Sequence, residues 1–270
     1  MSEYTLRLIS LGAGVQSTAM LLMAQAGELD EYGKVDGAVF ADTGWEPRAV
    51  MEHLEWLKGV STIPIYVVSQ GDLRADVIAK RRGDLPFHVK NADGDHALLR
   101  RSCTRDYKIY PIQKQTRILL GLKKGQRIPK GVRTQAWQGI SLDEIQRMKV
   151  NPLAWVDNFY PLVESGLSRH SCKLWLQDHG YPIPARSACI GCPFHGDDYW
   201  RKLKAESPDE FADAVEFDHW ARDGCNNVKF PAYLHTSLQP LDEVDFRNEE
   251  DRGQIDAFGF LNECEGYCGV

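Results

Sequence analysis

The amino-terminal part of the chain alternates short apolar runs with stretches of helical spacing, and this alternation constrains the fold more than any other feature. The runs over residues 5–10, 37–41 and 65–68 are short, apolar and bounded by turn residues, which is typical of buried strands. Parallel neighbours in a sheet need a helical crossover between them. The sequence therefore predicts an α/β fold with a doubly wound, mostly parallel sheet.

Later in the chain, three serines mark predicted helix starts. Ser141 opens a sequence with capping-box spacing, and Ser168 and Ser207 each precede a stretch of helical character. Residues 181–194 contain three prolines and two cysteines, so we expect a loop there. The second half is therefore predicted to be mainly helical.

Composition is ordinary for a globular protein, with 43% hydrophobic and 26% charged residues. No apolar run approaches the ~20 residues of a membrane helix, and Met1-Ser2-Glu3-Tyr4 lacks the basic start of a signal peptide. We therefore expect a cytoplasmic protein without a membrane span.

Seven cysteines in a reducing compartment indicate metal, cluster or redox chemistry, although several could be small buried apolar residues.

The net charge of −6 hides a strong asymmetry along the chain. Between Lys80 and Arg133 there are fifteen Lys or Arg against four acids, a balance of +11, whereas Leu241–Glu265 carries nine acids against two arginines. A concentrated basic segment in an acidic protein favours a large anionic partner, such as tRNA or DNA. A solvated helix face balanced by the acidic tail is the alternative.

The segment GAGVQST, residues 12–18, directly follows the first predicted strand and opens a helix. A strand, a glycine turn and a helix together direct free backbone N–H groups at an anion. A Walker A loop would need lysine where Gln16 stands, and a dinucleotide fingerprint would need a third glycine at Ser17. Neither motif is complete.

The same segment resembles the pyrophosphate loop of the PP-loop adenine-nucleotide α-hydrolase superfamily, whose pattern is S-G-G-x-D-S-T. It departs from that pattern in having Gln16 in place of the aspartate and in placing its first serine early, at Ser10. The resemblance implies binding of ATP with Mg²⁺ and release of pyrophosphate. The implied nucleotide ligands in this loop are Ser10, Gly12, Ala13, Gly14, Gln16, Ser17 and Thr18.

Two further segments resemble phosphoadenosine-phosphosulfate (PAPS) reductases and their relatives. FADTGWEP, residues 40–47, is similar to their DTG segment, which implies that Asp42, Thr43 and Gly44 join the nucleotide site and that Asp42 takes part in catalysis. A turn with a helix cap explains Asp42 equally well. KGVRTQAW, residues 130–137, is similar to the family's Gly-Ile-Arg strand end. It implies that Arg133 reaches the α-phosphate or a substrate anion, with a surface ion pair as the alternative.

Cys189-Ile-Gly-Cys192-Pro193 is the strongest single motif, because a C-x-x-C turn brings two thiolates to one metal. Its spacing alone allows an iron–sulfur cluster, zinc or two unligated thiols. RSCTRDYKIYP, residues 101–111, resembles the cysteine segment of the family's iron–sulfur branch, which favours a [4Fe–4S] cluster over zinc. The expected ligands are Cys103, Cys172, Cys189 and Cys192.

The terminal cysteines Cys264 and Cys268 are the rival source of the fourth ligand, and we expect Cys225 to be structural. Residues 162–200 and the ending NECEGYCGV resemble a bacterial and phage branch of the PAPS reductase-like family. We therefore expect a PP-loop core over residues 1–150 and a helical extension over residues 151–270 that carries the C-x-x-C loop and packs on the core.

The resemblance implies one of three functions. The first is an ATP-dependent, iron–sulfur-dependent sulfurtransferase that thiolates tRNA or DNA, supplied by a cysteine desulfurase or another sulfur donor, with Cys264 or Cys268 receiving persulfide. The second is a reductase that forms sulfite from PAPS or its unphosphorylated analogue, using a carboxyl-terminal cysteine as nucleophile. The third is a non-enzymatic nucleotide-binding module, because Gln16 replaces the family's aspartate.

Overall fold

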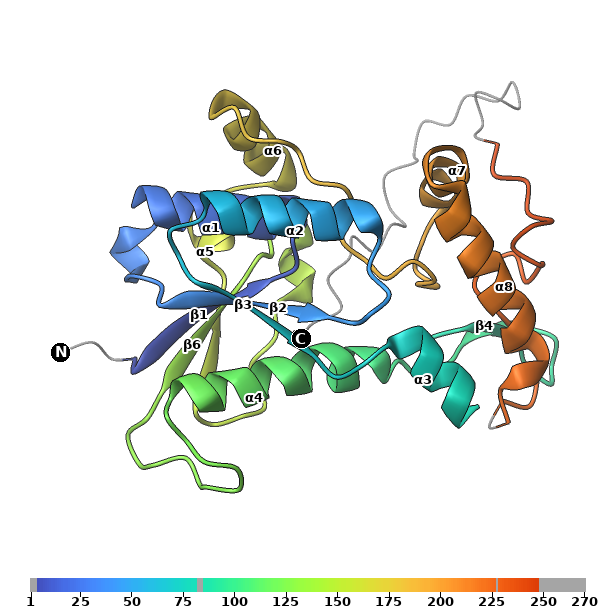
Figure 1. Cartoon of the computed structure of the whole chain (residues 1–270), viewed down its shortest axis with the longest axis horizontal. Helices are drawn as coiled ribbons and strands as arrows, with labels where there is room; N and C mark the ends of the chain where they lie inside the picture. Colours follow the sequence, from blue (N-terminus) through green and yellow to red (C-terminus); the bar gives the residue numbers. More distant parts are fainter. Residues whose placement is uncertain (1–3, 82–84, 227, 248–270) are drawn as a thin grey trace.

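The computed structural model describes residues 4–81, 85–226 and 228–247. Its centre is a five-stranded sheet in the order β3-β2-β1-β6-β7, with every neighbouring pair parallel (Figure 1). The predicted α/β fold with a doubly wound parallel sheet is confirmed. The elements of this part are β1 (Leu6–Leu11), α1 (Val15–Ala26), η1 (Asp30–Tyr32), β2 (Gly37–Asp42), α2 (Arg48–Val60), β3 (Ile65–Ser69), α4 (Tyr110–Leu119), β6 (Thr134–Gln138), η3 (Leu142–Arg147), β7 (Val156–Phe159), α5 (Pro161–Glu164) and α6 (Arg169–Asp178).

Helices cover the two faces of the sheet unequally. On one face, alternate β1 residues such as Ile9 and Leu11 pack with α1 and α2 in a core that includes Met20, Leu54 and Leu57. On the other face lies α4 (Figure 1). The first face is thus a conventional helix-on-sheet core, and the second leaves room beside a single long helix.

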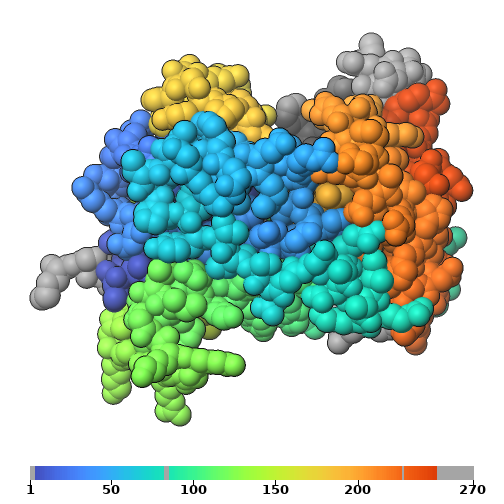
Figure 2. Space-filling view, in the orientation of Figure 1, coloured from blue at the N-terminus to red at the C-terminus, as the bar shows by residue number. Residues whose placement is uncertain are grey.

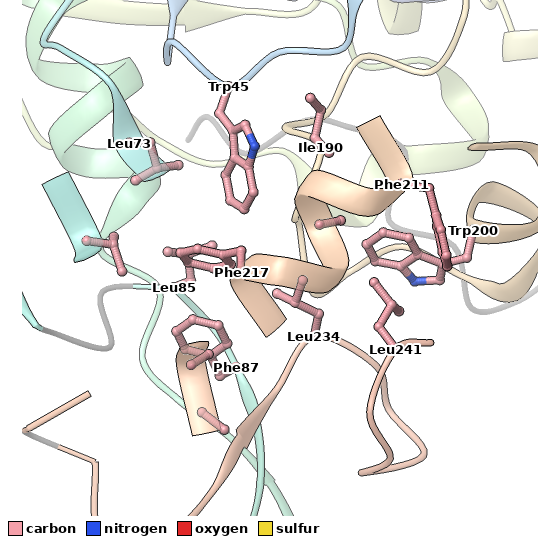
Figure 3. Close-up of a cluster of buried hydrophobic side chains, with 14 of the residues drawn as sticks. Trp45, Leu73, Leu85, Phe87, Ile190, Trp200, Phe211, Phe217, Leu234 and Leu241 are labelled. Carbon is pink, nitrogen blue, oxygen red and sulfur yellow. The ribbon is translucent and has the colours of Figure 1, made fainter. Parts of the chain in front are cut away.

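A second hydrophobic cluster lies beyond the carboxyl ends of the strands (Figures 1 and 3). Figure 3 shows Trp45 from the turn after β2 pointing toward Phe217, with Phe87 on the far side of Phe217; the Trp45 and Phe217 ring centroids are 4.6 Å apart. Trp200 is fully buried in the same cluster. Its elements are α3 (Leu73–Lys80), β4 (His88–Lys90), β5 (His96–Leu98), the π-helical η2 (Thr104–Ile109), α7 (Asp197–Glu206), α8 (Pro208–Gly224) and β8 (Ala232–Tyr233).

The expected division at residue 150 does not separate these two clusters. Strand β7 and helix α6 follow residue 150 yet belong to the first sheet and its core. Conversely, α3 and β4 precede it and pack in the second cluster. The chain therefore crosses between the clusters more than once, because the turn after β2 and the segment after β3 both run outward from the carboxyl edge.

Two local features differ from the sequence prediction. The segment after Ser141 is a 3₁₀ helix without a side-chain cap, because the Ser141 hydroxyl accepts a hydrogen bond from Gln16 Nε2 (3.4 Å) instead. The small antiparallel sheet β5-β4-β8 was not predicted, since strands of two or three residues give no recognisable period. In the ranges that the structure describes, every helix is too short or too polar to cross a bilayer.

Candidate functional site

The glycine turn stands at the point where the strand order reverses. The chain leaves β1 at Leu11 and enters α1 at Val15, while β6 pairs with β1 on the other side. Gly139, just after β6, packs so closely on the start of α1 that a Cβ there would lie 3.0 Å from Ser17 N. Open parallel sheets bind ligands in the crevice outside such a reversal. The topology alone therefore places a candidate site at this turn.

The turn leaves the positive end of α1 available to an anion. Gly14 precedes the helix in an extended conformation and makes no side-chain cap, and the first turn of α1 has no acidic residue. Ala13 has a φ of +58°, a left-handed conformation that alanine adopts only at a free-energy cost of about 1–3 kcal/mol. Unpaired helix N–H groups and the helix dipole both favour negative charge.

Two arginines that sequence reasoning did not select lie beside this turn. Arg169 Nη1 donates to Gln16 Oε1 (3.3 Å), and Gln16 Nε2 donates to Glu144 Oε2 (3.1 Å). Burial lowers the pKa of Arg169; Glu144 raises it, and the neighbouring Arg186 lowers it further. Two cations held together at a helix amino terminus favour a multiply charged anion.

The segment carrying Arg186 is fastened to the turn by its next residue. Ser187 Oγ donates to the carbonyl of Gly12, and a Cβ at Gly14 would lie 3.4 Å from Ser187 Cβ. The guanidinium of Arg186 also donates to the Phe194 carbonyl (3.4 Å), across the C-x-x-C loop. The proline-rich loop thus forms one wall of the glycine turn.

The hydroxyl groups of the predicted loop residues Ser17 and Thr18 make different hydrogen bonds. Ser17 Oγ accepts from Gly12 N (3.2 Å) and donates to Gly14 O (3.3 Å), so it braces the turn from within. Thr18 Oγ1 hydrogen-bonds the His53 ring (3.0 Å), and burial lowers the pKa of His53 to about 4, so the imidazole is neutral near pH 7. The Thr18 hydroxyl is therefore directed into the core.

A cavity of about 170 Å³ opens next to the turn on the α4 face of the sheet. It begins at Ser10 and Gly12 and runs beneath α4, where Ile112 forms part of its wall. Its surface is mainly apolar, and Gln138 and Lys108 contribute polar groups. An apolar slot with a few polar groups, adjacent to an anion-binding turn, has the character of a nucleoside pocket.

The Asp42-Thr43-Gly44 segment follows the carboxyl end of β2, at the same edge of the sheet as the glycine turn. Asp42 Oδ1 accepts the Gly44 N–H (2.7 Å), which is the turn that the alternative interpretation predicted. Gly44 has a φ of +71°, and a Cβ there would lie 2.8 Å from Asp72 Cα. Glycine is required at this position for both reasons.

Three of the predicted metal ligands line a second, small cavity. Cys103, Cys189 and Cys192 share it with Lys108 and with Thr43, whose hydroxyl lies 3.2 Å from Cys189 Sγ. Burial raises the pKa of the Cys189 thiol well above its ordinary value, and the nearby carboxylate of Glu46 raises it further. Cys189 is therefore a protonated thiol in this arrangement.

The two cavities meet at Lys108, which lines both. Its ammonium pairs with Glu46 Oε1 (3.4 Å), and the Glu46 side chain is only 1% exposed. The same oxygen accepts from Thr43 Oγ1 (3.0 Å) and from the Cys189 thiol (3.7 Å). A hydrogen-bonded chain thus runs from the nucleoside-like cavity to the thiols.

The C-x-x-C turn needs its central glycine for packing. A Cβ at Gly191 would lie 2.0 Å from the Trp45 ring, and Ile190 N donates to the Trp45 carbonyl (2.9 Å). Trp45 follows directly on the Asp42-Thr43-Gly44 turn, so packing on its ring holds Cys189 beside Thr43.

The expected fourth ligand, Cys172, is not brought to the other three. It is fully buried in the α1–α6 core, where burial raises the pKa of its thiol to about 12, and it does not line the thiol cavity. Cys225 is buried in the second cluster. The predictions for Cys264 and Cys268 concern residues outside the described ranges.

The thiol cavity offers donor atoms that suit a metal ion, but it is too small to hold an iron–sulfur cluster. Three thiols are ligands that soft metals prefer. The cavity measures about 20 Å³, which is room for about one water molecule. Over residues 4–81, 85–226 and 228–247, no three His, Cys, Asp or Glu side chains are arranged to hold a metal ion. A four-iron cluster therefore does not fit this arrangement.

Arg133 does not lie at the glycine turn. It precedes β6, and the parallel pairing of Leu6 with Thr134 places it at the amino edge of the sheet, opposite the turn. There its guanidinium donates to Asp157 Oδ2 (2.7 Å). Arg133 is therefore part of a surface ion pair, which was the alternative interpretation.

The basic segment Lys80–Arg133 is divided by the fold. Lys108 pairs with the buried Glu46 (3.4 Å), whereas the exposed Arg105 pairs with its neighbour Asp106 (2.8 Å). Others stand exposed on the loop between α4 and β6, which protrudes at the lower left of Figure 2. The exposed cations of this loop are Lys123, Lys124, Arg127 and Lys130.

Comparison with known proteins adds a likeness to solved structures. No protein-family model and no curated protein matches the sequence. Among solved structures, the chain is similar to phosphoadenylyl-sulfate (PAPS) reductase from Candida auris in its phosphate complex, at 13% identity and a TM-score of 0.43. The match covers 67% of this chain and 76% of that chain. The fold is an α/β fold, and its glycine turn lies at the carboxyl edge of the parallel sheet.

Proposed function

We propose that this protein is a PP-loop enzyme that binds ATP at the glycine turn, transfers its adenylyl group and uses the adjacent thiols for sulfur transfer to nucleic acid. The observation that carries the proposal is the hydrogen bond from Ser187 to Gly12. It joins the turn that would hold the phosphates to the segment that carries Cys189 and Cys192.

The proposed binding mode follows from the site's shape. The base and ribose occupy the 170 Å³ cavity beneath α4, and the phosphates lie over the amides at the start of α1. Arg169 and Arg186 stabilise the β- and γ-phosphates, and Mg²⁺ accompanies the nucleotide. Pyrophosphate held in this way is a good leaving group, so an acceptor oxygen attacks the α-phosphate and becomes adenylated.

Sulfur transfer is proposed because thiols stand next to the bound nucleotide. An adenylated oxygen is displaced when a sulfur nucleophile attacks the carbon or phosphorus that bears it, releasing AMP. Cys103, Cys189 and Cys192 line the cavity nearest this point, and a desulfurase or another sulfur donor would supply the sulfur.

Nucleic acid is proposed as the acceptor because exposed cations gather on the loop after α4. Between Asp106 and Asp143 the sequence contains eight Lys or Arg and no acid. Such a surface suits a phosphodiester backbone.

The function is tested with two substrates. Purified protein is incubated with γ-labelled ATP, sulfide and tRNA or DNA, and separately with PAPS and a thiol reductant. Pyrophosphate release that needs nucleic acid supports the proposal. Sulfite from PAPS without pyrophosphate release would instead assign a reductase, and ATP binding without turnover of either substrate would assign a binding module. Arg169→Met should suppress whichever activity is found.

A further inference from the structure

We infer that the side-chain carbonyl of Gln138 reads the exocyclic amino group of the nucleobase and thereby selects adenine over guanine. This inference rests on the proposed nucleotide site and names the residue that sets its base preference. The loop motif concerns phosphates only and says nothing about how the base is recognised.

Gln138 lines the large cavity in a fixed position. It is the last residue of β6 and pairs with Ser10 of β1, and it is only 5% exposed. Its Nε2 donates to Ser10 Oγ (3.1 Å), which fixes the orientation of the amide. Its Oε1 is buried and accepts no hydrogen bond from the described residues, and the side chain lines the cavity.

A buried acceptor without a donor is costly, by about 1–3 kcal/mol, unless a ligand or water supplies the missing hydrogen. Because Gln138 lines the proposed nucleotide cavity, a ligand N–H is the partner that we assign to its Oε1. Adenine presents an amino donor at its six position, whereas guanine presents a carbonyl acceptor there. Guanine would face Oε1 with a second acceptor and leave both oxygens unsatisfied.

The distance between Gln138 and the glycine turn suits a nucleotide whose base lies at Gln138 and whose phosphates lie at the turn. Ser10, its partner, precedes Gly12 by two residues, which is about 7 Å along a strand. A ribose bridges that gap between a base at Gln138 and phosphates at the turn. Apolar cavity walls, among them Phe40, Ile112 and Leu153, suit the faces of a purine ring.

The experiment measures equilibrium binding of ATP, GTP and purine riboside triphosphate, which is ATP without its amino group. The wild type should bind ATP about tenfold more tightly than purine riboside triphosphate, and GTP more weakly than both. Gln138→Met removes the acceptor at similar volume. It should lower the affinity for ATP about tenfold and leave that for purine riboside triphosphate nearly unchanged.

The matched control is Gln177→Met, which alters an exposed glutamine of α6 that does not line the cavity and should keep the preference for ATP. Thermal unfolding checks that each variant folds. If Gln138→Met does not fold, the wild-type comparison of ATP with purine riboside triphosphate decides alone. Equal binding of these two ligands by the wild type overturns the role of Gln138 while leaving the nucleotide site intact. Failure to bind any nucleotide overturns the proposed function itself.

Discussion

The hydroxyl of Ser187 donates a hydrogen bond to the carbonyl of Gly12, although 175 residues separate the two in sequence. This contact packs the proline-rich loop on the glycine turn, so Arg186 and Cys189 come to the same edge of the sheet as the start of α1. The neighbouring Ala13, with its left-handed backbone, is fully buried beneath the same contact. An anion bound at the turn would thus lie beside both arginines and thiols.

The first prediction concerns the phosphate-binding arginine. Arg169→Met should raise the dissociation constant for ATP by about 10–100-fold, because one charge-assisted hydrogen bond contributes about 1.5–3 kcal/mol. The control is Arg133→Met, since Arg133 pairs with Asp157 at the opposite edge of the sheet. Isothermal titration with both variants checks the result. If the Arg133 variant lost more affinity for ATP than the Arg169 variant, Arg133 would have to be assigned to the nucleotide site.

The strands and most helices could be predicted from the sequence because their signals are local. Asp72, for example, caps α3 by accepting from Ala75 N (2.8 Å), and Ser168 forms a capping box with Ser171. The alternation of strands and helices then limits the sheet to a parallel arrangement. Local signals of this kind need no knowledge of which segments later meet.

The candidate site was predictable only where its residues are close in sequence. The glycine turn and the C-x-x-C motif have short spacings, but Arg169 and Arg186 reach the turn through α6 and a loop, with no spacing rule to mark them. Arg133, by contrast, was predicted to join the site and lies away from it. The motif resemblance placed it at the nucleotide, whereas strand direction places it at the other edge.

The second prediction concerns the cysteines. Cys103, Cys189 and Cys192 line one cavity but are not arranged to hold a metal ion as they stand, so metal binding requires these thiols to close on the ion. Serine at any of the three should then abolish binding of zinc or iron, whereas Cys172→Ser should retain it. The small cavity predicts about one metal ion per chain. Elemental analysis of anaerobically purified protein provides the measurement. Four irons per chain would show that the cavity opens to admit a cluster, and metal-free wild-type protein would contradict the prediction.

The third prediction concerns the loop between α4 and β6. Because β6 starts at the amino edge beside Leu6, the length of the six-residue β1, about 20 Å, separates this loop from the glycine turn. A nucleic acid that contacts both must be longer than a few nucleotides. Reversing the four exposed cations of the loop should weaken tRNA or duplex binding and reduce its salt dependence, because each lost phosphate contact lowers the slope by roughly 0.9.

Affinity for ATP should not change in that variant, since the loop does not line the cavity. The matched control reverses four exposed lysines elsewhere, namely Lys34, Lys58, Lys149 and Lys204. Filter binding at several salt concentrations distinguishes the two sets. An equal loss in both would indicate a general charge effect and remove the loop as a binding surface.

The last prediction concerns the stability of the fold in acid. Burial lowers the pKa of His53 from 6.5 to about 4, and burial together with the Arg186 charge lowers that of His195 to about 3. As the pH falls from 6.5 toward 4, the unfolded chain gains protons on these imidazoles that the folded chain does not bind. The free energy of unfolding should therefore decrease, by up to about 1.4 kcal/mol per pH unit for each histidine.

His53→Gln tests this assignment, because glutamine can keep a hydrogen bond to Thr18 Oγ1 but does not titrate. Its unfolding free energy, from urea denaturation at pH 7.0 down to about pH 5, should depend less steeply on pH than that of the wild type. His170→Gln changes an exposed histidine and should leave the slope as it is. If both variants keep the wild-type slope, the acid sensitivity comes from other groups, and the buried His53–Thr18 pair does not link protonation to folding.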